Sequence, residues 1–293
     1  MWALRFLVVE SETKEDREAR RESAGKSAGE SYAATLEQLC PGALTERVTP
    51  SDAHATPMSA GDIGGFDAVF VSGSPLHVYD RCPEVDRQLD FMRAVFASGT
   101  PSFGSCAGLQ LAVAAAGGSV RKMPRMEAAI ARRITATDAG RDHPLLAGRP
   151  AAWDAPAIHG DEVESLPSGS RCLATNGVTA IQAAEIRFGR GVFWGVQYHP
   201  ELAPGEIAAA LRRQAADLVD AGLGEGEAEI EERAGLLDRL HRNPDSRSAR
   251  WLLGVDDEFA VEARRRRELI NFLGAVPDLR TYRERQVKTE LAA

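Results

Sequence analysis

The sequence lacks several features that would place a chain in a special class. No apolar run approaches the roughly 18 residues needed to span a bilayer. The net charge of -8 disfavours general binding of nucleic acids or anionic membranes. The four cysteines are scattered and form no C-x-x-C pair, which argues against a zinc site. Residues 1–10 are apolar but lack the basic start and the cleavage pattern of a signal peptide. We therefore expect a cytoplasmic protein with reduced thiols.

The sequence does contain apolar strand patterns that alternate with amphipathic helix patterns. Near-continuous apolar runs at residues 4–10 and 66–72 are typical of central strands that are covered on both faces. Helical spacing follows them at residues 32–40 and 85–98, and again at 204–221. Further strands are expected at 44–48, 128–136, 151–163, 171–175, 180–188 and 191–197, with Asn176-Gly177 joining two of them in a hairpin. This alternation predicts an α/β fold with a mostly parallel central sheet and helices on both faces. Residues 11–30 are charged and rich in Ser and Gly, so we expect a mobile loop or a frayed helix there.

The stretch around Cys106 is the most informative part of the chain. Small residues on both sides of Cys106 allow a sharp turn between a short strand and an apolar helix that begins near Ala107. The partial positive charge of a helix N-terminus stabilises a thiolate. The pattern is that of a nucleophile elbow with cysteine in place of serine, although a lone cysteine is more often a buried core residue.

Two other stretches carry partners for such a nucleophile. The strand at 191–197 delivers His199 to its end, where it is a candidate base, and Glu201 is a candidate for orienting the imidazole. The apolar strand at 66–72 ends in a Gly73-Ser74-Pro75 turn, whose backbone N–H groups are candidates for holding an oxyanion. Each stretch is weak evidence alone, because a structural histidine, a solvated glutamate and a turn after a strand are all common.

Taken together and in this order, the three stretches resemble the class I glutamine amidotransferases, a family with a Cys-His-Glu triad and a flavodoxin-like sheet. The resemblance covers roughly residues 4–210 and is nearest to stand-alone relatives of the amidotransferase domain of GMP synthase, whose His-x-Asp segment is matched by His159-Gly160-Asp161.

The resemblance implies roles for individual residues. Cys106, His199 and Glu201 would form the triad, and the backbone N–H groups of Gly73 and Ala107 would form the oxyanion hole. Gln110 and the backbone around His159 would contact L-glutamine. The implied reaction proceeds through a γ-glutamyl thioester and needs no metal or other cofactor. Because no synthetase motif is present, the ammonia acceptor would be a separate synthetase chain, and self-association into a homo-oligomer is left open.

Three functional hypotheses remain open at this point. The first, which the His159-Gly160-Asp161 segment favours, is a glutaminase that passes ammonia to an amination partner. The second is a γ-glutamyl hydrolase that uses the same triad with water as the only acceptor. The third is a non-enzymatic binding or regulatory module, which typically loses the cysteine or the histidine that are both present here.

The last part of the chain lies outside the resemblance. After the glycine-rich stretch at 222–226 we expect a helical C-terminal extension, so the predicted domains are residues 1–221 and 222–293. Helices are expected at 227–242, 248–253 and 259–273, with apolar stripes at Leu236, Leu237 and Leu240 and at Leu269, Ile270, Phe272 and Leu273. The basic run at 264–267 is expected to form a solvated helix face. Packing of this extension on the first domain is favoured over docking of a partner.

Overall fold

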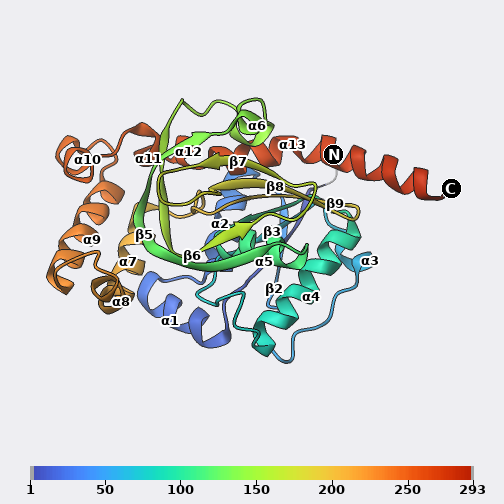
Figure 1. Ribbon diagram of the computed structural model, residues 1–293, viewed down its shortest axis with the longest axis horizontal. Helices are drawn as coiled ribbons and strands as arrows, with labels where there is room; N and C mark the ends of the chain where they lie inside the picture. Colours follow the sequence, from blue (N-terminus) through green and yellow to red (C-terminus); the bar gives the residue numbers. More distant parts are fainter. Residues whose placement is uncertain (1–2, 292–293) are drawn as a thin grey trace.

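The computed structural model describes residues 3–291, with side chains described through residue 283. Within this range a nine-stranded sheet runs through the centre of the molecule in the order β2-β1-β3-β4-β9-β8-β7-β5-β6 (Figure 1). The strands are β1 (Arg5–Val9), β2 (Leu44–Val48), β3 (Ala68–Val71), β4 (Ser102–Ser105), β5 (Ser119–Ala136), β6 (Trp153–Ser165), β7 (Arg171–Thr175), β8 (Ala183–Phe188) and β9 (Gly191–Val196).

The sheet has a parallel half and an antiparallel half. Strands β2, β1, β3, β4 and β9 pair in parallel. Strands β8, β7, β5 and β6 continue the sheet with antiparallel pairing. The predicted α/β class is confirmed, and the parallel pairing is confined to the half that is built from strand–helix–strand crossovers. The predicted hairpin through Asn176-Gly177 is the β7–β8 connection.

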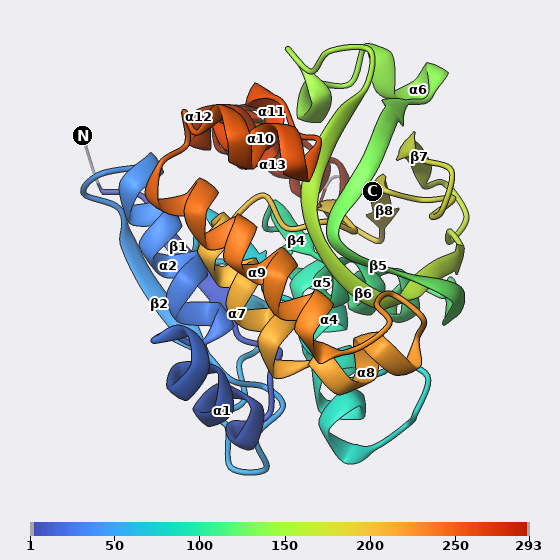
Figure 2. The ribbon, with the colours of Figure 1, turned by 90° about the vertical axis from the view of Figure 1, so that its left-hand side faces the viewer.

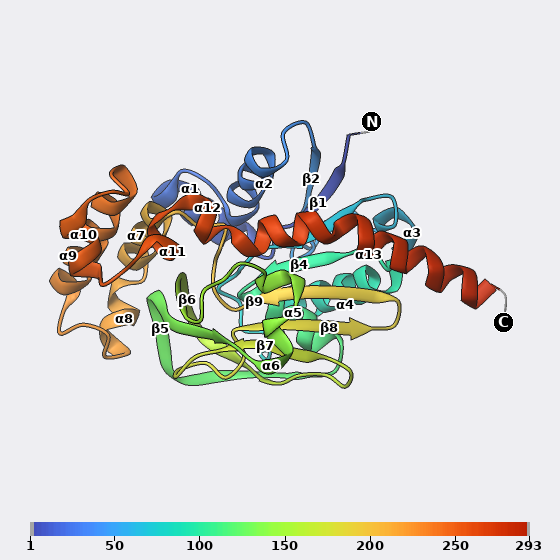
Figure 3. The same ribbon diagram turned by 90° about the horizontal axis from the view of Figure 1, so that it is seen from above.

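Alternating side chains of the parallel strands build the two faces of the sheet. Phe6, Phe70 and Trp194 point to one face, which is covered by α2 (Ala28–Leu39) and α13 (Arg267–Leu291). Intervening side chains such as Leu7 and Phe193 point to the other face, which is covered by α3 (Ala60–Ile63), α4 (Pro83–Ser98) and α5 (Ala107–Ala115). The view in Figure 3 shows α13 running alongside the sheet. Helices therefore lie on both faces, as the period-2 pattern of the strands requires.

The expectation of a loop or frayed helix over residues 11–30 is wrong. The segment forms helix α1 (Lys14–Ala24), which Thr13 caps by accepting a hydrogen bond from the Asp16 N–H. Arg17 of this helix is buried and pairs with Asp52 at 2.7 Å. The polar side chains that suggested a solvated loop thus cap the helix and form an ion pair.

One other predicted segment is divided in the structure. The helix expected over 204–221 is two helices, α7 (Pro204–Arg213) and α8 (Ala215–Asp220), with a break at Gln214. Residues 138–150, between two of the predicted strands, contain α6 (Asp138–Arg141) and a 3-10 helix, η1 (Pro144–Leu146).

The C-terminal extension is helical and contacts the rest of the chain on two sides. It comprises α9 (Glu227–Arg242), α10 (Arg247–Leu253), α11 (Asp257–Ala260), α12 (Glu262–Arg265) and α13, so the helix expected over 259–273 is three helices. Helix α9 packs beside α7, where Ile207 and Leu211 share a buried cluster with Leu237 and Leu240 (Figure 2). Helix α13 places Leu269 and Phe272 in the core of the sheet, whereas Ile270 is 41% exposed. The extension therefore packs on the first domain, as predicted. The domain boundary at residue 221 stays a prediction.

The basic run at 264–267 does not form the solvated face that was expected. Arg265 and Arg266 are buried and Arg267 is half-buried, while Arg264 is exposed and pairs with Glu258 at 3.3 Å. No helix within residues 3–291 is both long and apolar enough to cross a membrane.

Candidate active site

Cys106 lies at the junction of β4 and α5 in a backbone conformation that L-residues rarely adopt. Its φ and ψ are 54° and -113°, and its N–H donates to the Val196 carbonyl of β9 at 2.8 Å. The turn is possible because residues 104 and 108 are glycines, which have no Cβ. A Cβ at Gly108 would lie 2.5 Å from the Val71 carbonyl oxygen, and one at Gly104 would lie 2.8 Å from the Phe193 ring. The strained residue is thus held in place by strands on both sides, which is the arrangement of a nucleophile elbow.

His199 lies immediately beyond β9 and faces Cys106. The backbone N–H of His199 donates to the Pro156 carbonyl at 2.8 Å, and the ring Nδ1 lies 2.8 Å from Glu201 Oε1. Burial of the ring opposes protonation, but the Glu201 carboxylate and the hydrogen-bonded Cys106 sulfur outweigh it and raise the pKa of His199 to about 10. The imidazole is therefore protonated through the neutral range. The structure brings all three predicted triad residues together, although they are distant in sequence.

On its other side, Glu201 is hydrogen-bonded to the first of two linked hydroxyl groups that sequence reasoning missed. Ser105 Oγ donates to Glu201 Oε2 at 2.8 Å, and the Tyr32 hydroxyl lies 2.5 Å from Ser105 Oγ. Complete burial and the nearby Glu201 charge raise the pKa of Tyr32, which keeps its hydroxyl protonated and able to donate to Ser105. Nothing in a single sequence links Tyr32 of α2 to a glutamate 169 positions later, since only the fold makes them neighbours.

Gly73 and Ala107, the two residues predicted to form the oxyanion hole, both lie beside the cysteine. A Cβ at Gly73 would lie 2.9 Å from His199 Cε1 and 3.6 Å from Cys106 Cβ, so the turn after β3 passes directly against the Cys-His pair. Ala107 is the first residue of α5, whose first turn leaves backbone N–H groups without helical partners. Both backbones are therefore beside the sulfur.

The side chains of the two residues expected to contact substrate are buried, and both form hydrogen bonds with other protein groups. Gln110 Nε2 donates to the Asp161 carbonyl at 3.1 Å and to Gln197 Oε1 at 3.2 Å. The His159 ring lies between the Asp161 carbonyl at 2.9 Å and Glu127 Oε2 at 3.2 Å. The side chains of Gln110 and His159 thus fix the segment that ends at Asp161, and their contact with substrate remains a proposal.

Glu127 is a second residue that sequence reasoning missed. This buried carboxylate accepts hydrogen bonds from Asn176, Thr179 and Gln182 at 2.6 to 2.8 Å, besides its contact with His159. Burial opposes the charge of Glu127, but these partners prevail and lower its pKa below the usual value. The network ties the β7–β8 loop to the His159 segment. Among the described residues, no group of three or more His, Cys, Asp or Glu is arranged to hold a metal ion.

Comparisons with known proteins agree with this geometry. The family model described as glutamine amidotransferase class-I matches residues 29–217. A γ-glutamyl-L-1-hydroxyisopropylamide hydrolase from Pseudomonas sp. is 37% identical over 228 residues, which span 76% of each chain. The GMP synthase of Thermomicrobium roseum is 32% identical over 147 residues, which are 50% of this chain but only 25% of that enzyme. A solved glutamine amidotransferase from Thermotoga maritima superposes with a TM-score of 0.62 and 14% identity, covering 94% of this chain and 99% of that one. That structure bears on the fold alone.

Proposed function

Because the chain belongs to the class I glutamine amidotransferase family and is an amide-hydrolysing enzyme, we propose that it hydrolyses γ-glutamyl amides through a thioester on Cys106. The observation that carries this proposal is the contact of Cys106, held in a strained elbow, with a His199 whose pKa is raised to about 10 by Glu201 and by the sulfur itself. A protonated imidazole beside a sulfur is the arrangement that activates cysteine nucleophiles.

In the proposed cycle His199 holds the thiol proton while the Cys106 sulfur attacks the γ-carbonyl carbon. The oxyanion is stabilised by the backbone N–H groups of Gly73 and Ala107, and loss of one such donor typically costs about 100- to 1,000-fold in rate. His199 then protonates the leaving nitrogen as the C–N bond breaks. A water molecule hydrolyses the thioester to glutamate, and His199 accepts the water proton. Glu201 keeps the ring oriented throughout.

For the leaving group, we favour a substituted amine over ammonia. The hydrolase from Pseudomonas, whose name specifies a γ-glutamyl alkylamide, matches three quarters of both chains. The chain spans only about a quarter of the GMP synthases that it matches, so the synthetase part of those enzymes has no counterpart in the match. A glutaminase that supplies ammonia to a separate synthetase is the second candidate, supported by the likeness to the amidotransferase portion of GMP synthase.

The test is a glutamate-release assay of the purified full chain with γ-glutamyl-L-1-hydroxyisopropylamide and with glutamine. We expect kcat/KM for the substituted amide to exceed that for glutamine by at least about 10-fold, a difference of about 1.4 kcal/mol in transition-state binding. Cys106→Ser should abolish both activities, while Cys40→Ser, at a half-buried cysteine away from the elbow, should leave them intact.

The other outcomes separate the alternatives. Preference for glutamine, with stimulation by a co-purifying synthetase, would support the second candidate. A folded chain with no activity on either amide, with or without such a partner, would contradict both and favour a binding module. Retention of activity by Cys106→Ser would remove the basis of the mechanism.

A further inference from the structure

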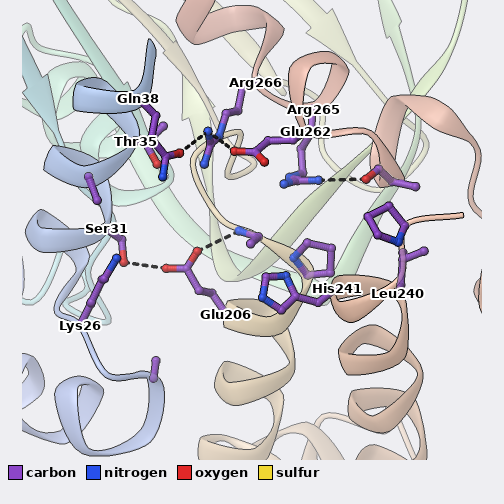
Figure 4. Close-up of a pocket in the computed structure, with 16 residues that line it drawn as sticks. Lys26, Ser31, Thr35, Gln38, Glu206, Leu240, His241, Glu262, Arg265 and Arg266 are labelled. Carbon is purple, nitrogen blue, oxygen red and sulfur yellow. Dashed lines mark hydrogen bonds and ion pairs between the residues drawn. The ribbon is translucent and has the colours of Figure 1, made fainter. Parts of the chain in front are cut away.

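A cavity of about 390 Å³ lies outside the candidate active site, and Figure 4 shows side chains that line it. Its walls come from α2, the start of α7, the end of α9 and α12, so residues from both ends of the chain enclose it. Neither Cys106 nor His199 lines it, but Thr35 in its wall donates to the Glu201 carbonyl at 3.4 Å. The cavity is therefore a separate space that adjoins the backbone of the triad.

The charges on the cavity wall are unbalanced toward the positive. Lys26, Arg265 and Arg266 line it together with only two carboxylates, Glu206 and Glu262. Figure 4 shows that these carboxylates are already engaged. Glu206 accepts hydrogen bonds from the Ser31 hydroxyl at 2.6 Å and from the Ala203 N–H at 2.9 Å. Glu262 pairs with Arg266, which also donates to Gln38.

Arg265 has no carboxylate counter-ion among the described residues and, unlike the exposed Lys26, it is buried. It is 4% exposed, and its Nη1 donates to the carbonyls of Phe259 at 3.0 Å and Ala260 at 3.4 Å. Its Nε has no hydrogen-bond partner, and no carboxylate of the described residues lies within ion-pair distance of it. Burial and the neighbouring Arg266 lower the pKa of Arg265 to about 10, and the charges of Glu262 and Glu206 oppose this shift only in part.

The contrast with Arg149 shows how the same fold treats another buried arginine. The Arg149 side chain is 2% exposed, and it pairs with Glu258 and with Glu268, both at 2.7 Å. A buried arginine is ordinarily paired in this way, because an uncompensated charge in a protein interior is costly. The cavity beside Arg265 offers room for the missing negative charge.

We propose that this cavity binds a small oxyanion, a carboxylate or a phosphate, as the counter-ion of Arg265. A guanidinium presents a planar fork of N–H donors that suits both kinds of anion, and Arg266 and Lys26 add positive charge on the same wall. Because Glu206 already caps the first turn of α7, the helix N-terminus is not the binding group. The site is distinct from the one that hydrolyses the amide.

The experiment measures thermal unfolding and calorimetric binding of the full chain with inorganic phosphate or with citrate, against sodium chloride of equal ionic strength. At about 100 times the Kd, either anion should raise the Tm by about 5 °C more than chloride does. Whichever anion gives the larger shift identifies the source as phosphoryl or carboxylate, and both outcomes support the site.

Substitutions separate specific binding from the general stabilising effect of such salts. Arg265→Met should remove the anion-specific shift and, without anion, should be at least as stable as the natural chain, because the unpaired buried charge is gone. Arg212→Met is the matched control, since Arg212 of α7 pairs with Glu231 and Asp238 of α9 and does not line the cavity. It should keep the full shift.

The proposal is overturned if Arg265→Met responds to phosphate and citrate as the natural chain does, or if neither anion exceeds chloride. A large loss of stability in Arg265→Met that anions do not influence would assign Arg265 a purely structural role through its two carbonyl contacts. Should that variant not fold, Lys26→Met serves instead, with an expected loss of at least about 2-fold in calorimetric affinity; an unchanged affinity would count against the site.

Discussion

Replacing Phe272 with alanine tests whether helix α13 belongs to the same core as the strands that carry the active site. Phe272 is fully buried, and its ring lies 5.5 Å from Phe70, 5.5 Å from Phe103 and 5.8 Å from Trp194, measured between centroids. Truncation of a buried phenylalanine costs about 3–5 kcal/mol, and the three aromatic contacts favour the upper part of that range. We expect the free energy of unfolding to fall by about 4 kcal/mol.

Ile270→Ala is the matched control on the same helix. Ile270 is 41% exposed, so its truncation should cost about 1 kcal/mol or less. Urea unfolding of both variants, followed by circular dichroism, gives the two free energies. Because Phe103 lies on β4 and Trp194 on β9, Phe272→Ala should also lower amide hydrolysis. If the two variants lost equal stability, α13 would not be part of the core, and the C-terminal extension would be better explained as a docking element.

Three further predictions concern the active site. Gly73→Ala puts a Cβ 2.9 Å from His199 Cε1 and should lower kcat about 100-fold, whereas Gly235→Ala, which meets nothing within 4 Å, should leave steady-state rates unchanged. Ser105→Ala removes the 2.8 Å bond to Glu201 and should lower kcat about 10-fold without a comparable change in KM; an unchanged kcat would show that the bond is incidental. The pKa of His199 rises from 6.5 to about 10 on folding, so its contribution to stability is complete below pH 6.5 and is lost as the pH approaches 10. His199→Ala should therefore lose less unfolding free energy between pH 6.5 and pH 10 than the natural chain does, as measured by urea unfolding. If the unfolding free energies of the variant and the natural chain fell in parallel over this range, the assignment would be contradicted.

The elements that local pattern determines were predictable from the sequence. The apolar run at 66–72, the helical spacing at 227–242 and the small residues around Cys106 each specify a structure over a few neighbouring residues, and β3, α9 and the elbow follow them. The stretches that carry Cys106 and His199 with Glu201 could also be joined into one candidate site, through their resemblance to the class I glutamine amidotransferases. The parallel pairing of β4 with β9 brings them to the same edge of the sheet.

Contacts between distant residues were decided only by the tertiary structure. The polar composition of residues 11–30 indicates a solvated loop, but pairing of Arg17 with Asp52 makes α1 an ordered part of the fold. Tyr32 and Ser105 become supports of Glu201 only when α2 is laid beside β4. In the same way, a run of four arginines has the pattern of an exposed helix face, and only the tertiary structure buries Arg265 of α12 in the wall of a cavity that α2 and α9 also line. Periodicity and residue type describe how a segment can fold, whereas burial and charge balance depend on which segments the whole chain brings together.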